Sequence, residues 1–201
     1  MFLDNVQYKK NEWQNRNKIK TPQGWQWITV PVKYKFPQKI SEVHIENTTQ
    51  WKRKHLAAIK TNYSKAPYFD NYLSFFEKLF SMDWEVISSL NIYLIKEIME
   101  FLKINTETYI SSELEKFPDS PDERLISLCK YFGANKYLAG AGGKGYMDCN
   151  KFKESGIEVL FQEYNHPAYL QLYGFFEPNM SIIDLLFNCG KDSLKILTGD
   201  K

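Results

Sequence analysis

The chain has 201 residues, of which 43% are hydrophobic and 25% are charged, as in a folded globular protein of one or two domains. No apolar run approaches the roughly 20 residues of a membrane-spanning helix, so we expect a cytoplasmic protein without an integral membrane segment. The net charge is only +2, but residues 1–60 contain 12 Lys and Arg against 4 Asp and Glu, whereas residues 61–201 contain 14 against 20. This asymmetry indicates either an anionic small-molecule partner or a lysine-rich solvated face, and we expect no nucleic-acid partner.

Short strands and one helix are expected in the amino-terminal part. Apolar patterning predicts strands at Phe2–Val6, Trp25–Val30 and Val43–Ile45. Thr49 can cap a helix that continues to about Tyr63. Between the first two strands lies a polar, basic run at residues 9–17, which is either a ligand-binding segment or a solvated loop.

Two strongly apolar helices are predicted next. Hydrophobic residues recur there at helical spacing. They are Phe69, Tyr72, Leu73, Phe76, Leu79 and Phe80 in the first helix, and Trp84, Ile87, Leu90, Leu94, Ile98 and Phe101 in the second. We interpret residues 67–103 as a helical insertion on a sheet.

A βαβ unit is predicted around residue 120. Ser120-Pro121-Asp122-Glu123 combines an S-x-x-E capping box with proline at the first helical position, and Gly133 supplies the stop. Short strands are expected on both sides of this helix, at Thr108–Ser111 and Lys136–Ala139. Such a unit implies a parallel sheet.

The remaining elements continue the alternation. A short helix is expected at Cys149–Glu154, a strand at Ile157–Gln162 and a helix from Ser181. The alternation predicts the α/β class, with a Rossmann-like layered fold and a mainly parallel sheet. We expect a single domain over residues 1–201.

Two segments carry residues suited to an anionic ligand. In the basic run, Lys10 and Arg16 offer positive charge, and the amides of Asn15 and Asn17 offer directional hydrogen bonds. The second segment is the turn Gly140–Gly145, where Gly142, Gly143 and Lys144 could approach a phosphate. It matches neither GxxxxGK[ST] nor a full GxGxxG, so a flexible strand-to-helix turn is an equal alternative.

His55 is the candidate general base, because an unperturbed imidazole titrates near neutral pH. A structural or simply exposed histidine is the alternative. His166 is a weaker candidate, and Asp184 is interpreted as the acidic member of an S-x-x-D cap. The three cysteines are far apart and form no CxxC pattern, so neither a disulfide framework nor a metal site is expected. No cofactor can be named.

The chain resembles the WbqC-like family of bacterial proteins. The resemblance is carried by LDNVQYKKNEWQNRNKIKTPQGWQWITVPV, WKRKHLAAIKTNYSKAPYF, YLAGAGGKGYMD and SIIDLLFNCG, which occur in the family's order from residue 3 to residue 190. Family members typically open with an HQPxYLPW-type segment ahead of an LDDVQ block. That segment is absent here and Asn5 replaces the second aspartate, so we expect an N-terminally truncated chain.

The resemblance implies a transferase of O-antigen or other surface-polysaccharide biosynthesis. A glycine or other acyl group would be transferred to a sugar nucleotide or a lipid-linked sugar. Asp4, in the LDNVQ block, joins His55 as a catalytic candidate, and Gln7 joins the substrate-binding candidates. A nucleotidyltransferase-like enzyme and a non-catalytic sugar-nucleotide-binding protein remain open as alternatives.

Overall fold

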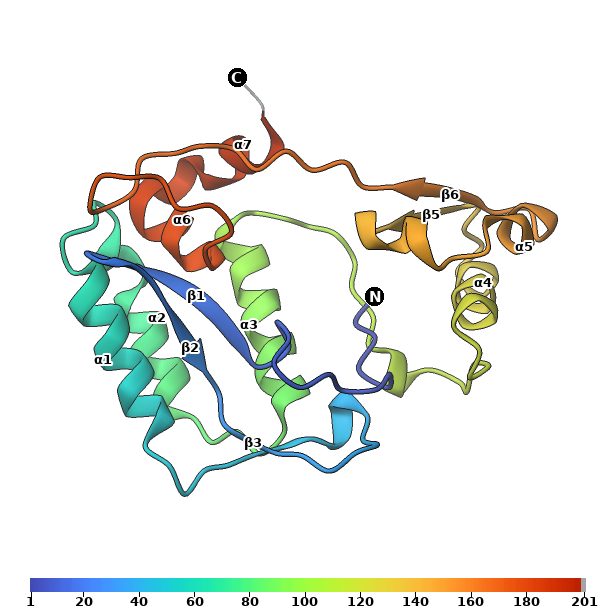
Figure 1. The fold of residues 1–201 in the computed structure, drawn as a ribbon, viewed down its shortest axis with the longest axis horizontal. Helices are drawn as coiled ribbons and strands as arrows, with labels where there is room; N and C mark the ends of the chain where they lie inside the picture. The colour runs from blue at the N-terminus through green and yellow to red at the C-terminus, as the bar shows by residue number, and fades with distance from the viewer. Residues whose placement is uncertain (200–201) are drawn as a thin grey trace. The chain divides into compact units, whose positions relative to one another are not determined.

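The computed structural model describes residues 1–199, which divide into two compact units (Figure 1). Unit 1 consists of Met1–Glu113 together with the described part of His166–Lys201, and unit 2 consists of Leu114–Asn165. Each unit has its own cluster of buried apolar side chains. Within residues 1–199, every helix is too short or too polar to cross a membrane.

Unit 1 contains two antiparallel strand pairs. Strand β1 (Arg16–Thr21) pairs with β2 (Gly24–Thr29), and β3 (Val32–Lys33) pairs with β4 (His44–Ile45). Strands β2 and β4 confirm the predictions for those segments. Gly24 closes the turn between β1 and β2 with φ +117°, a conformation that L side chains rarely adopt.

Strand β1 was not expected, because its sequence is polar and basic. Its cations instead lie over aromatic rings of β2: Arg16 Cζ is 4.2 Å from the centroid of the Trp27 ring, and Lys18 Nζ is 4.2 Å from that of Trp25. These cation–π contacts stabilise a cross-strand face that has no run of aliphatic side chains.

The strands predicted at Phe2–Val6 and Thr108–Ser111 are wrong. An isolated bridge joins Phe2 to Ile110, and the chain then enters the 3₁₀ helix η2 (Ser111–Glu113). The cause is the buried carboxylate of Asp4, which accepts bonds from Ser111 Oγ (3.1 Å), Ser112 N (2.9 Å) and Ser112 Oγ (2.6 Å). Such side-chain bonds compete with a strand ladder.

Helices make up the rest of unit 1. The α-helices are α1 (Trp51–Tyr63), α2 (Phe69–Ser81), α3 (Ile87–Phe101), α6 (Ile182–Cys189) and α7 (Ser193–Thr198). The remaining 3₁₀ helices of unit 1 are η1 (Ile40–Glu42) and η4 (Gly190–Asp192). The predicted helices in 67–103 are confirmed. Helix α1 ends at Tyr63 as predicted, but its N-cap is Gln50, one residue after Thr49.

Unit 2 is a small α/β unit. It contains α4 (Pro121–Tyr131), β5 (Lys136–Ala139), the 3₁₀ helix η3 (Ala141–Gly145), α5 (Cys149–Glu154) and β6 (Glu158–Phe161). Strands β5 and β6 are parallel, so the βαβ unit runs from β5 through α5 to β6, and the version starting at Thr108–Ser111 is wrong. Helix α4 begins at Pro121 as predicted, although the Ser120 side chain makes no capping bond.

The mixture of helices and strands is confirmed, but the Rossmann-like layered fold is not. In the described part of the chain the strands form three separate two-stranded sheets, two of them antiparallel. Among residues 1–199 only β5 and β6 are parallel, and the two-residue connection between β1 and β2 requires that pair to be antiparallel.

A buried polar network joins β1, α1 and α6. Asp184 is fully buried, and its two carboxylate oxygens accept bonds of 2.9 Å from the hydroxyls of Tyr63 and Tyr169. The Tyr63 hydroxyl also accepts a 2.9 Å bond from the backbone N–H of Lys20. Burial raises the pKa of Asp184 above its usual range, against the lowering effect of these hydroxyls. Asp184 is therefore a hydrogen-bonded residue of the core, and Ser181 makes no capping bond that would complete a capping box with it.

Removing the Tyr63 hydroxyl should destabilise unit 1. Tyr63→Phe leaves one Asp184 oxygen and the Lys20 N–H buried without their partner, so the free energy of unfolding should fall by about 1–3 kcal/mol. Urea melts followed by circular dichroism measure this loss. The matched control is Tyr72→Phe, a half-buried tyrosine of α2, which should change stability by less than about 0.5 kcal/mol. Equal losses in the two variants would contradict the assignment.

Candidate functional site

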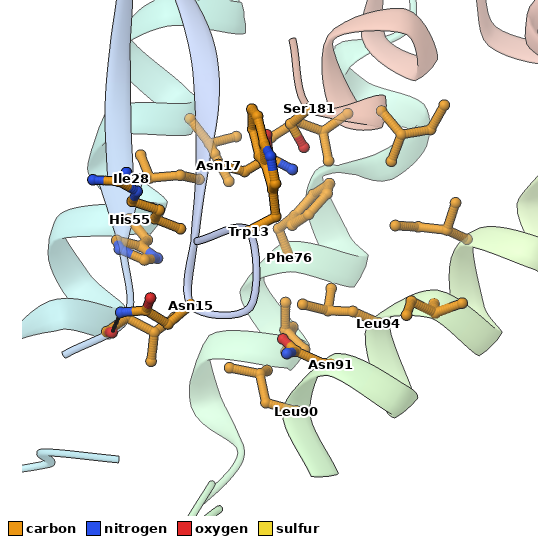
Figure 2. Close-up of a pocket in the computed structure, with 18 of the residues that line it drawn as sticks. Trp13, Asn15, Asn17, Ile28, His55, Phe76, Leu90, Asn91, Leu94 and Ser181 are labelled. Atoms are coloured by element: carbon orange, nitrogen blue, oxygen red, sulfur yellow. Dashed lines mark hydrogen bonds between the residues drawn. The ribbon is translucent and has the colours of Figure 1, made fainter. Parts of the chain in front are cut away.

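A pocket of about 340 Å³ lies in unit 1 between the β1–β2 hairpin and helices α1, α2, α3 and α6 (Figure 2). This volume is within the usual range for small-molecule sites. Most of its lining is apolar. Its polar residues are Gln14, Asn15, Arg16, Asn17, His55, Asn91 and Ser181.

The apolar wall comes from α2 and α3. Phe76, Leu79 and Phe80 line it from α2, while Leu90 and Leu94 line it from α3, in each case at helical spacing. These are members of the apolar faces predicted from the sequence. The two faces thus form the core of unit 1 and also one side of the pocket.

Asn15 is held firmly at the edge of the hairpin. Its Nδ2 donates to the Val30 carbonyl at 2.9 Å, and the Val30 N–H donates to the Asn15 carbonyl at 2.8 Å. Its Oδ1 is buried and has no hydrogen-bond partner among residues 1–199, and the same is true of Arg16 Nε. Unpartnered buried polar atoms cost free energy, which is consistent with a site that a ligand completes.

Asn17 belongs to β1, and Ser181 is the N-cap residue of α6. Asn17 Oδ1 accepts a 2.8 Å bond from the Lys18 N–H, which leaves its Nδ2 as a donor. The Ser181 N–H donates to the Lys18 carbonyl at 2.8 Å, and this bond places the start of α6 against the strand. Ser181 is only 8% exposed, and its hydroxyl makes no capping bond. Both side chains line the pocket.

His55 occupies the hairpin side of the pocket, only 8% exposed (Figure 2). Its Nε2 lies 3.0 Å from the Thr29 carbonyl oxygen, which can only accept, so Nε2 carries the hydrogen and Nδ1 is the unprotonated nitrogen. Burial lowers the pKa of His55 by more than the Thr29 hydrogen bond raises it. The imidazole is therefore neutral at neutral pH, as a general base requires.

The aromatic neighbours of His55 keep its ring in place. The Trp51 and Phe80 rings meet it edge to face, with centroid distances of 5.3 and 5.9 Å. The spacing of Trp51 and His55 on one helical face was visible in the sequence, whereas Phe80 reaches the ring from α2.

The pocket unites four of the predicted site residues: Asn15, Arg16, Asn17 and His55. Asp4, Gln7 and Lys10 belong to unit 1 but do not line it. Asp4 is engaged by Ser111 and Ser112, while Gln7 and Lys10 are exposed.

The glycine-rich candidates belong to unit 2. Gly142, Gly143 and Lys144 form part of η3, directly after β5. A Cβ on Gly143 would come within 2.9 Å of Met147 Sδ, so packing accounts for this glycine. Lys144 Nζ lies 3.1 Å from Glu163 Oε1 in an exposed ion pair.

Sequence reasoning missed two polar residues of the pocket. Asn91 of α3 donates through Nδ2 to the Gln14 carbonyl at 2.7 Å, and Ser181 begins α6. Asn91 lies at helical spacing with Ile87 and Leu94, on the apolar face of α3, and this was an available signal. His166 is outside the pocket; its ring stacks on Tyr169, and Nδ1 lies 2.9 Å from the Pro167 carbonyl. Among the described residues, no three His, Cys, Asp or Glu side chains are grouped so that they could hold a metal ion.

Two of the comparisons with known proteins gave matches. The model of the WbqC-like protein family matches residues 1–196. The chain is 40% identical over 197 residues to "Uncharacterized protein Rv1507c" of Mycobacterium tuberculosis, an alignment that covers 96% of this chain and 84% of the relative. No solved structure matches the chain.

The buried His55 should make stability depend on pH. Its pKa in the folded chain is below the ordinary value of 6.5, so the unfolded chain binds the proton more readily and acid favours unfolding. Its stabilising contribution is complete above about pH 6.5 and is lost as pH falls through the lower folded pKa. His55→Gln keeps a donor for Thr29 but does not titrate. Urea melts measure how much larger the free energy of unfolding is for the unchanged chain than for this variant. This difference should shrink as pH falls from about 7.5 to about 5.5, and a difference that stays constant would contradict the assignment.

Proposed function

The chain belongs to the WbqC-like protein family, and we propose that it is a transferase in the assembly of O-antigen or other surface polysaccharides. In this proposal it moves an acyl group onto an amino or hydroxyl group of a sugar nucleotide or lipid-linked sugar. Glycine is the acyl group that the family resemblance implies. We also propose that the two units work as one domain, because the family match spans both.

The observation that carries this proposal is the position of His55. A neutral, buried imidazole lines the same pocket as the amides of Asn15 and Asn17. His55 would accept the proton of the sugar hydroxyl or amine as that group attacks the acyl carbonyl carbon. The bond between the acyl group and its carrier then breaks, and the proton passes to the departing carrier. The Thr29 carbonyl, bonded to Nε2–H, would stabilise the imidazolium formed in between.

Positive charge for an anionic substrate lies on the adjoining face of the hairpin. Arg16 and Lys18 stack over Trp27 and Trp25, which are 36% and 42% exposed. Arg16 presents a planar guanidinium, the geometry that binds phosphate best. In unit 2, Lys144 with Gly142 and Gly143 is a separate proposed phosphate-binding segment, because an exposed ion pair such as Lys144–Glu163 is weak and readily exchanged.

A binding protein without catalysis is the second candidate. The pocket lining supports this candidate. Among the described residues that line the pocket, only His55 and Arg16 have titratable side chains. A nucleophile paired with His55 is absent from that lining, so any reaction depends on the substrate's own nucleophile.

Replacing His55 should separate these candidates. With labelled glycine or acyl donors and sugar-nucleotide acceptors, His55→Gln should lower kcat by about a hundredfold or more and leave KM nearly unchanged. His166→Gln, outside the pocket, is the matched control and should retain full activity. If the unchanged chain binds a sugar nucleotide without turnover, and His55→Gln binds it equally well, the binding-protein candidate is correct.

A further inference from the structure

We propose that the pocket of unit 1 binds an aliphatic acyl chain that ends in a neutral carbonyl group, in preference to a glycyl group. This inference rests on the proposed acyl transfer and specifies which group is transferred. It comes from the distribution of apolar, charged and polar atoms around the pocket.

The wall opposite the hairpin is suited to a hydrocarbon chain. Leu94 and Ile98 of α3 line the pocket and are half-buried, and Ile95, which also lines it, is 42% exposed. Leu90 and Phe76 on the same side (Figure 2) are almost fully buried and offer a ligand little surface. A glycyl group has no side chain to cover this surface. An aliphatic chain would replace water along it and gain free energy with every methylene buried.

The charges of the pocket oppose an aminoacyl group. A glycyl group carries an ammonium ion at neutral pH, and burying such an ion without an anion is costly. The described lining contains neither Asp nor Glu, and its one permanent charge is the positive Arg16. An uncharged acyl chain has no ion to bury and is not repelled by the positive charge of Arg16.

The polar end of the ligand is matched by donors where α6 begins. Asn17 and Ser181 both line the pocket here, and Ser181 is only 8% exposed. The donors that they offer are Asn17 Nδ2 and the Ser181 hydroxyl. The hydroxyl makes no capping bond to α6. These donors, with the first N–H groups of α6, fit a carbonyl oxygen.

A neutral carbonyl fits this position better than a carboxylate. Asp184 stands in the first turn of α6 and already supplies negative charge to the positive end of the helix. A carboxylate there would be a second acidic group to bury beside Asp184, whereas a neutral carbonyl brings no charge to bury. Asn17 and Asn15 lie on either side of Arg16 along the chain. His55 bonds to the carbonyl of Thr29, and Thr29 is the β2 residue that pairs with Arg16, so His55 lies at the same end of the hairpin as these amides. A carbonyl bound at this wall thus shares it with the proposed base.

Binding of uncharged amides tests this assignment without any need for turnover. The probes are straight-chain primary amides from butanamide to decanamide, with glycinamide as the charged comparison, measured by titration calorimetry and by tryptophan fluorescence. Affinity should rise about fourfold with each added methylene until the pocket is filled, and glycinamide should not bind measurably.

Two variants locate the chain and the carbonyl. Leu94→Phe narrows the apolar end, so the rise in affinity should stop at a shorter amide; Leu170→Phe, at a side chain that is 88% exposed, is its control. Ser181→Ala should weaken every amide by a similar factor, about fivefold or more for one lost hydrogen bond. Thermal melts of each variant establish that it is folded before binding is compared.

The outcomes distinguish the two proposals. Affinity that does not depend on chain length, or tighter binding of glycinamide than of butanamide, overturns the acyl-chain assignment. Chain-length-dependent binding that Leu94→Phe shortens supports it. Such binding with no transfer by the unchanged chain would refute the proposed transferase function and leave the acyl-chain pocket standing.

Discussion

The hydroxyl of Tyr63 is the contact on which the site depends. It accepts from the backbone of β1 and donates to Asp184 of α6, and so one buried group joins a strand and two helices. It sets the distance between β1, which carries Asn17, and α6, which Ser181 caps. A polar link of this kind is directional, whereas the surrounding aromatic packing is not. We infer that it defines one arrangement of the pocket wall.

The chemistry of the pocket follows from its apolar surroundings. The rings and aliphatic side chains around His55 remove it from water, which lowers the pKa of His55 and keeps the ring uncharged. The same apolar surface would attract a hydrocarbon chain. Desolvation thus supplies both the base and the proposed specificity, and the polar atoms of β1 and α6 supply orientation.

The sequence predicted some elements better than others, for physical reasons. Helices α2 and α3 were predictable because each buries one continuous apolar face. Strand β1 was not, since its stabilising partners are tryptophans of another strand. The strand expected at Thr108–Ser111 failed because a carboxylate distant in sequence, Asp4, binds that segment.

The candidate site shows the same division. Asn15, Asn17 and His55 were identifiable by residue type, and the structure places all three on one pocket. Ser181 was hidden, because its position depends on a backbone bond to Lys18 across more than 160 residues. Asp184 looked like a helix cap, although tertiary contacts with two tyrosines decide its role.

The most direct test of the central claim, that one pocket joins a neutral His55 to an acyl-binding wall, is the ring-nitrogen NMR spectrum of the three histidines during titration with octanamide. The account predicts that at neutral pH His55 is the uncharged Nε2–H tautomer, and that octanamide shifts its ring signals while those of His44 and His166 stay in place. A protonated His55 at neutral pH, or His55 signals unmoved by saturating octanamide, would contradict it.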